Sequence, residues 1–292
     1  ETKLSMMRRL SCEIDDPAMQ LAAPLPRAGQ SQRVMLFWND HPLYLMKYVT
    51  GRRASFRRSA DVESILSALG TLHRTAREFL DRHPEFADLD PPRTLRETMI
   101  DDLRAYRKML GYIDSPPDRR MVWRLLRVGR LRLQRTIEFA GSLIDSIPDE
   151  AAGLTVRHGD SHENNYILRD GAGEAPARDG CCLIDLESVI IGPAVEDLIV
   201  PLWGVMRYSR YRRAPLMEAL RTYTDRNSLS EGERQFLLAH LILPRVWHRA
   251  VTRMLRPHHS WANPKSLQRF VLGLSLLPPA ERLARTFSGM AP

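Results

Sequence analysis

Two polar segments hold the side chains best suited to chemistry. Residues 157–166 read Arg-His-Gly-Asp-Ser-His-Glu-Asn-Asn-Tyr and supply Asp160 and Asn165. Residues 183–187 read Leu-Ile-Asp-Leu-Glu and supply Asp185. A carboxylate can orient or deprotonate an attacking hydroxyl, and carboxylate and amide oxygens are ligands that hold Mg²⁺ on nucleotide phosphates. The set and its spacing therefore favour phosphoryl transfer from a nucleotide.

Each of these residues also has a plainer interpretation. Asp160 could cap its own turn, and Asn165 could be a satisfied turn amide. However, Asn165 is expected to open a strand, where Asn is disfavoured unless its side chain has a role. Asp185 is expected to emerge at the end of an apolar strand, as a metal ligand should. Because the three occur together at these intervals, we favour the functional interpretation.

Four further polar residues are expected to support the site. His158 and His162 have i, i+4 spacing, but in a glycine-containing loop that spacing builds no metal site, so hydrogen bonding that holds the loop is expected. Glu187 is either a second group near the metal or a solvated residue, and the sequence does not choose. Asp197 is expected to begin a helix, where capping is favoured over holding the loop.

Composition and motifs argue against other classes of protein. The 292 residues lack a P-loop, a dinucleotide-binding glycine motif and a Gly-x-Ser-x-Gly elbow. The net charge of +8 comes from Arg spread along the chain, which favours a solvated surface and makes nucleic-acid binding a distant alternative. No membrane-length apolar run and no signal-peptide pattern are present, and the three cysteines form no Cys-x-x-Cys. A cytoplasmic, reducing location without a membrane role is expected.

The elements predicted around the site give an α+β plan. A β-hairpin is expected from strands at 33–38 and 43–49. Helices are expected over residues 1–20 with Pro17 ending the pattern, 61–80 with Asp61 as cap, 94–110, 116–144, 194–209, 214–226, 230–252 and 264–287. Short strands are expected at 154–156, 166–168 and 181–184, and a loop at 21–30. We expect a small first lobe over residues 1–50, a hinge near 46–51 and a large helical lobe over 51–292, with the chemistry between the lobes.

These motifs resemble a known family. Residues 158–165, His-Gly-Asp-Ser-His-Glu-Asn-Asn, are similar to the H-G-D-L-H-P-G-N loop of the aminoglycoside/choline phosphotransferase superfamily. Residues 183–187, with Gly192-Pro193 and Asp197-Leu198 downstream, resemble its I-D-[WF]-E…G…D-L segment. Residues 43–51 look like its hinge, and residues 69–73, Leu-Gly-Thr-Leu-His, look like its L-a-x-L-H helix. The similarity extends to bacterial spore-coat kinase-like members and covers residues 33–210.

The resemblance implies a protein-kinase-like, two-lobe fold with a reduced or truncated first lobe, and ATP and Mg²⁺ as cofactors. It implies that Asp160 is the catalytic base and that Asn165 and Asp185 hold Mg²⁺. It further implies that adenine hydrogen-bonds to the backbone of the hinge residues Lys47, Tyr48 and Val49.

The sequence departs from the family pattern in two places. Glu163-Asn164 replaces Pro-Gly, a change that a loop can tolerate. The family's upstream strands carry a phosphate-covering loop and an ATP-binding lysine, and no counterpart is apparent before residue 33. Lys3 is a poor candidate for that lysine, and Glu13 is a candidate for its acidic partner.

Two functions remain as hypotheses. The first is an ATP- and Mg²⁺-dependent phosphotransferase that moves the γ-phosphate to a hydroxyl of a small molecule or of a peptide Ser/Thr, with the acceptor against the helices after residue 194. The positive charge tilts this hypothesis toward an anionic or peptidic acceptor, and a protein partner could complete the site. The second is a pseudokinase that acts as a binding or coat-like scaffold protein. The intact set of Asp160, Asn165 and Asp185 argues against it.

Overall fold

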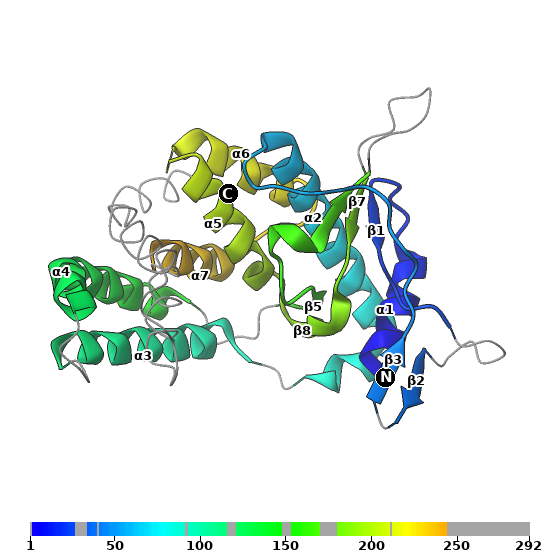
Figure 1. Ribbon diagram of the computed structural model, residues 1–292, viewed down its shortest axis with the longest axis horizontal. Coiled ribbons are helices and arrows are strands. Elements are labelled where there is room, and N and C mark those ends of the chain that lie inside the picture. Colours follow the sequence, from blue (N-terminus) through cyan, green and yellow to red (C-terminus); the bar gives the residue numbers. More distant parts are fainter. Residues whose placement is uncertain are drawn as a thin grey trace. The chain divides into compact units, whose positions relative to one another are not determined.

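The computed structural model describes residues 2–26, 34–39, 41–90, 93–115, 121–147, 153–169, 180–210 and 212–243. The chain divides into two compact units, and Figure 1 draws the elements of both. The first unit comprises Glu1–Arg93 and Ala151–Leu229, and the second comprises Thr94–Glu150 and Ser230–Pro292. Every candidate site residue lies in the first unit. The lobe boundary expected at residue 50 stays a prediction.

A four-stranded sheet in the first unit brings the two polar segments together. Its strands, in spatial order, are β1 (Met19–Leu21), β7 (Cys181–Leu183), β6 (Tyr166–Leu168) and β4 (Arg52–Arg53). Strands β6 and β7 are antiparallel, and β1 runs parallel to β7 beside it (Figure 1). The prediction of helix and loop over residues 1–30 missed β1. Three residues are too few to show a strand period, and the partner strand lies far along the chain.

The hairpin is confirmed, with shorter strands than predicted. Strands β2 (Met35–Trp38) and β3 (His41–Tyr44) pair in antiparallel register. Asn39, in the turn, has a φ of 47°, a conformation that Asn tolerates better than most residues. The second strand was expected to reach residue 49 but ends at Tyr44, and beyond it only Met46 forms an isolated bridge, with Pro24.

Helices pack around these strands in the first unit. They are α1 (Thr2–Glu13), α2 (Ser59–Arg82), α5 (Ile199–Tyr208) and α6 (Arg213–Thr224), with short 3-10 turns at Pro84–Leu89, Glu163–Asn165, Leu186–Ser188 and Ala194–Leu198. A second antiparallel pair, β5 (Leu154–Arg157) with β8 (Ile190–Pro193), packs against α2. Helix α2 buries Ile65, Leu66 and Leu69, as its apolar period predicts. Asp61 does not cap this helix: it is buried and binds Arg52 and the Ser55 N–H instead.

The second unit is helical in its described part. Its helices are α3 (Leu95–Asp114), α4 (Met121–Ser142) and α7 (Glu231–Ile242), and a 3-10 turn spans Ile144–Ser146. Thr94 and Ser230 each form a capping box, with Glu97 and Glu233, so the starts predicted at 94 and 230 are confirmed. The predicted helix at 264–287 and the end of that at 230–252 lie outside the described residues.

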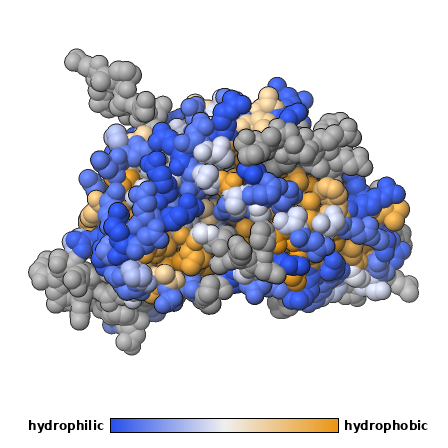
Figure 2. Space-filling model, turned by 180° about the vertical axis from the view of Figure 1, so that it is seen from behind, coloured by the Kyte–Doolittle hydropathy of each residue, from blue (hydrophilic) through white to orange (hydrophobic). Residues whose placement is uncertain are grey.

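The surface agrees with the sequence in two respects. On the face drawn in Figure 2 hydrophilic residues predominate, and hydrophobic ones are interspersed among them. Within the described ranges, no helix combines the length and apolarity needed to cross a bilayer. Helices with several short sheets make the α+β class clear.

Candidate active site

The loop between β5 and β6 is held in shape by its own backbone. The His162 N–H donates to the Asp160 carbonyl oxygen at 2.8 Å, and the Asn165 N–H donates to the His162 carbonyl oxygen at 2.9 Å. Gly159 has a φ of 78°, and a Cβ there would lie 2.0 Å from the Ser188 carbonyl oxygen. Only glycine fits this position, because both the backbone angle and the available space exclude a side chain.

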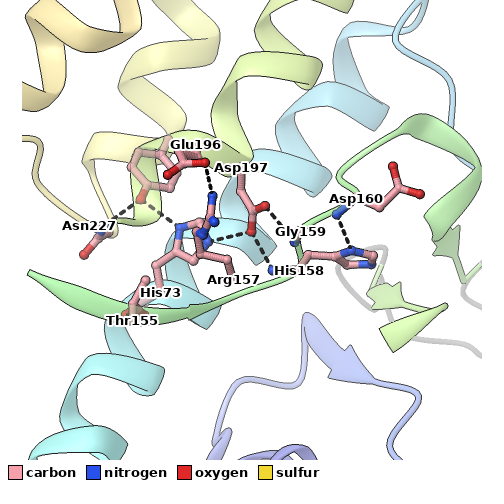
Figure 3. A network of polar contacts seen from close by, with 10 residues as sticks. His73, Thr155, Arg157, His158, Gly159, Asp160, Glu196, Asp197 and Asn227 are labelled. Carbon is pink, nitrogen blue, oxygen red and sulfur yellow. Dashed lines mark hydrogen bonds and ion pairs between the residues drawn. The ribbon is translucent and has the colours of Figure 1, made fainter. Parts of the chain in front are cut away.

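Asp160 and Asn165 meet inside this loop. The Asn165 side-chain nitrogen donates to the Asp160 main-chain oxygen at 2.9 Å and lies 3.4 Å from Oδ2 of its carboxylate. Asn165 is buried, whereas the Asp160 side chain is 46% exposed and its carboxylate points away from the polar network in Figure 3. No group in the described part of the chain donates to the Asn165 amide oxygen, so that oxygen is available to a ligand.

Asp185 follows directly after the residue that pairs with Asn165. The Ile184 N–H donates to the Asn165 carbonyl oxygen at 3.0 Å, so the ends of β6 and β7 bring the two polar segments side by side. Asp185 is exposed and has φ 62° and ψ 55°, the left-handed region that non-glycine residues rarely occupy. Such backbone strain is typical of functional positions. The strand predicted at 181–184 ends at Leu183, one residue earlier than predicted.

The hinge side of the first unit faces the second polar segment. Burial first, and then the negative charges of Glu187 and Asp185, raise the pKa of Tyr44 above its ordinary value. Both carboxylates therefore lie close enough to act on the end of β3. Glu187 is itself exposed, which leaves both interpretations of this residue open.

The three hinge residues are accessible. Lys47 and Tyr48 are exposed and Val49 is half-buried. The isolated bridge between Pro24 and Met46 places the Lys47 N–H beside Ala23, whereas the backbone groups of Tyr48 and Val49 make no hydrogen bond to another described residue. Backbone donors and acceptors that have no protein partner can hydrogen-bond to the edge of a base.

His158 links the two segments through its ring. Its Nε2 lies 2.8 Å from the Ile184 carbonyl oxygen, and the Asp160 N–H donates to its Nδ1 at 3.3 Å (Figure 3). The first bond needs a hydrogen on Nε2 and the second a lone pair on Nδ1, so one neutral tautomer satisfies both. These two bonds are of the kind expected of a residue that holds the loop, and that role of His158 stays a prediction. His162 has its Nε2 3.4 Å from the Asp160 Oδ2, and its buried Nδ1 has no partner among the described residues.

Asp197 is a buried acceptor for the loop, and the capping prediction is wrong. Its carboxylate accepts the N–H of His158 at 2.6 Å and the N–H of Gly159 at 3.0 Å. It also lies 3.1 Å from Nε2 of His73. Burial opposes ionisation, but the hydrogen bond from His73 and the positive charge of Arg157 hold the pKa of Asp197 well below its usual range.

The network continues through residues that sequence reasoning missed. His73 Nδ1 lies 2.9 Å from the Tyr223 hydroxyl, which accepts a hydrogen bond from the Asn227 side chain at 2.6 Å. Thr155 donates its hydroxyl to the His73 carbonyl oxygen at 2.8 Å. With hydrogen on Nε2 of His73, donors and acceptors run in one direction from Asn227 to Asp197 (Figure 3). In the sequence His73 appeared only as the last residue of the segment 69–73, and a histidine within a largely apolar helix was the signal.

Arg157 is a second missed residue. It precedes the loop, is buried, and pairs with Glu196 at 2.6 Å. A Cβ on Gly192 would lie 3.1 Å from its Nε, so the glycine makes room for the guanidinium. A buried arginine at this point keeps a positive charge near Asp197.

The donor set fits a magnesium ion on a nucleotide. Within the described ranges, no three His, Cys, Asp or Glu side chains come close enough to hold a metal by themselves. Mg²⁺ on a nucleotide needs fewer protein ligands, because phosphate oxygens and waters complete its shell. The free amide oxygen of Asn165 and the exposed carboxylate of Asp185 are hard oxygen donors of this kind.

Comparison with known families decides the class of protein. The sequence profile of the phosphotransferase enzyme family (APH) matches residues 15–237, more than half of the chain. The chain belongs to this family. The resemblance to aminoglycoside/choline phosphotransferases is therefore confirmed, and so is the expectation of a kinase-like phosphotransferase.

Solved structures of phosphotransferases share the fold. An aminoglycoside phosphotransferase from Alicyclobacillus acidocaldarius is 16% identical with a TM-score of 0.76, over 99% of this chain and 84% of that one. Spectinomycin phosphotransferase, crystallised with ADP and spectinomycin, is 11% identical with a TM-score of 0.61, over 99% and 82%. A choline/ethanolamine kinase family protein from Mesorhizobium loti is 13% identical with a TM-score of 0.56, over 98% and 82%. The predicted α+β, protein-kinase-like fold is confirmed. A search of curated protein sequences found no significant match.

Proposed function

We propose that this phosphotransferase moves the γ-phosphate of ATP to a hydroxyl group of a small molecule, with Mg²⁺ as the metal cofactor. The observation that carries the proposal is the placement of three residues on neighbouring segments. Asn165 contacts Asp160 within one loop, and the Ile184 N–H ties Asn165 to the residue before Asp185. A scaffold protein has no physical need for this arrangement.

Asp160 is proposed as the catalytic base. Its carboxylate is half-exposed, and of the described side chains only Asn165 and His162 approach it, each at 3.4 Å. The carboxylate is therefore free to accept the proton of an acceptor hydroxyl, or to align that hydroxyl with the γ-phosphate. The hydrogen bonds from Asp160 N–H and to its carbonyl oxygen hold its backbone in position meanwhile.

Asn165 and Asp185 are proposed as the residues that hold Mg²⁺. When bound, Mg²⁺ neutralises the charge that develops on the phosphates. Asn165 is pre-oriented, because its amide nitrogen is engaged by the loop and its oxygen is left free. Asp185 is held by the unusual backbone conformation at the end of its strand. Glu187 remains either a supporting group or a solvated residue.

The nucleotide is proposed to bind along the hinge. The backbone groups of Lys47, Tyr48 and Val49 suit the hydrogen-bonding edge of adenine, and those of Tyr48 and Val49 have no partner among the described residues. Leu45 and Met46, just before them, are exposed apolar side chains, as is the ring of Tyr48, and these suit the faces of a base. The spectinomycin phosphotransferase with the same fold was crystallised with ADP, which supports a nucleotide here.

The acceptor is proposed to be a small molecule held near α5 and α6. A pocket of about 250 Å³ lies between the start of α2 and these two helices. Charged groups of both signs line it, among them Arg57, Glu63, Arg212 and Glu218. Its size suits a small polar molecule better than a peptide, and the spectinomycin phosphotransferase is an example with such an acceptor. A peptide acceptor remains the alternative.

The test is transfer of labelled γ-phosphate from ATP to a panel of amino sugars, amino alcohols and one Ser/Thr peptide. We expect a labelled small molecule with the wild-type protein and a loss of about 10²- to 10⁴-fold in turnover with Asp160→Asn. Asp81→Asn is the matched control, because Asp81 is an exposed aspartate on α2 with no contact to the loop. Labelled peptide alone would favour the peptide alternative. Undiminished turnover by Asp160→Asn would remove its assigned role, and no transfer with nucleotide bound would favour the pseudokinase.

A further inference from the structure

The segment that follows the hinge lies along the catalytic loop. Gly51 has a φ of 145°, and a Cβ there would lie 2.4 Å from the Leu168 carbonyl oxygen, so the segment starts in close contact with β6. The Ala54 N–H then donates to the Tyr166 carbonyl oxygen at 3.0 Å. These contacts reach β6, the strand that leaves the loop, but not the loop itself.

Glu163 supplies the contact to the loop itself. Its Oε2 accepts the Phe56 N–H at 2.8 Å, a bond between residues 107 positions apart in the chain. Glu163 opens the 3-10 turn Glu163–Asn165, so it lies between Asp160 and Asn165 in sequence. The family pattern has proline at this position, and proline offers no side-chain acceptor.

Phe56 is itself held firmly on its other side. Its side chain is buried and lines the pocket beside α5. A Cβ on Gly204 of α5 would lie 2.3 Å from the Phe56 ring, so ring and helix backbone are in direct contact. The next residue, Arg57, places its guanidinium 5.1 Å from the centre of the Tyr208 ring. Phe56 is therefore a rigid anchor, and its N–H is a donor fixed in space.

We propose that Glu163 is a positioning residue of the catalytic loop, whose side chain holds the turn carrying Asn165 against the Phe56 anchor. This inference rests on the proposed function, because it assumes that Asp160 and Asn165 act in phosphoryl transfer. A hydrogen bond to an ionised acceptor is stronger than a neutral one, and a loop residue displaced by about 1 Å can cost about 100-fold in rate. Displacing this turn should therefore lower turnover through Asp160 and Asn165, with a smaller effect on nucleotide affinity through Asn165 alone.

The experiment compares Glu163→Ala, which removes the acceptor, with Glu163→Gln, whose amide oxygen can still accept the Phe56 N–H. Asn164→Ala is the matched control, since Asn164 is the exposed neighbour in the same turn. We expect Glu163→Ala to lower kcat about tenfold or more and to raise KM for ATP by a smaller factor. Glu163→Gln should recover most of the loss, and Asn164→Ala should match the wild type.

Amide hydrogen exchange at Phe56 gives a readout that does not depend on activity. We expect the Phe56 N–H to be protected in the wild type and in Glu163→Gln, and to exchange faster in Glu163→Ala. Equal exchange in all four proteins would overturn the contact. Normal protection with an unchanged kcat in Glu163→Ala would overturn the positioning role. If the wild type transfers no phosphate, the proposed function fails and the positioning role fails with it, whereas the exchange result still reports on the contact.

Discussion

Asp197 and the pair of Asp160 and Asp185 are the same residue type in opposite environments. Asp197 is buried and its carboxylate receives two backbone N–H groups and faces His73. Asp160 is half-exposed with only weak side-chain contacts, and Asp185 is exposed. A carboxylate whose lone pairs are taken holds structure, whereas one with free lone pairs can bind a proton or a cation. Asp197 holds the shape of the loop, and Asp160 is the exposed carboxylate that this loop presents.

The largest expected stability effect separates these two environments. Asp197→Ala leaves the N–H groups of His158 and Gly159 and the His73 ring without their acceptor in a buried site. We expect it to lower the free energy of unfolding by about 3 kcal/mol or more, and Asp160→Asn to change it by less than about 0.5 kcal/mol. Urea denaturation of both variants measures the difference. Equal losses of unfolding free energy in the two variants would contradict the different roles of Asp197 and Asp160.

A smaller effect concerns pH. Because the pKa of Asp197 is lowered in the folded chain, its ionised form contributes stability at any pH above its unfolded value of about 3.9. That stability is lost progressively as the pH falls below about 3.9, because Asp197 then takes up a proton in the unfolded chain while it stays ionised in the folded chain. We expect the urea midpoint to drop more steeply below pH 4 in the wild type than in Asp197→Asn. Parallel pH curves would assign the acid sensitivity to other groups.

The placement of Asp160, Asn165 and Asp185 on neighbouring segments was predictable because it is local in sequence. Asp160 and Asn165 lie in one loop, and Asp185 lies two residues beyond β7, the strand that pairs with the strand after that loop. Residues close in sequence stay close in the fold here, because the antiparallel strands β6 and β7 bring the end of β7 back beside the start of β6. The glycine at position 159 is also explained by the loop, because its backbone has a positive φ that glycine adopts most easily.

The supporting network was not predictable, because its members are distant. His73 reaches Tyr223 across 150 positions and Asp197 across 124. Each residue can be explained from its neighbours in sequence alone. His73 can be read as part of a helix face, Tyr223 as a core aromatic residue and Asp197 as a helix cap. Only the packing of α2 against β5 and α6 brings them together. Glu163 was treated as a tolerable loop change for the same reason, since its partner Phe56 is 107 positions away.

The upstream residues of the family pattern find other partners here. Lys3 forms an ion pair with Asp90 at 2.6 Å, in agreement with the expectation that it is a poor candidate for the ATP-binding lysine. Glu13 pairs with Arg82 and His83 rather than with a lysine.

The most direct test of the account is Mg²⁺-dependent stabilisation by ATP, measured as a shift in melting temperature with and without Mg²⁺. Asp185→Asn keeps a residue that tolerates the left-handed backbone and removes the negative charge, and Asp81→Asn is the control. At about 100 times Kd a ligand stabilises the folded chain by about 2.7 kcal/mol. We predict a clear upward shift with Mg²⁺ and ATP in the wild type and in Asp81→Asn, and loss of its Mg²⁺-dependent part in Asp185→Asn. The same shift in all three proteins, or none in the wild type, would contradict the account.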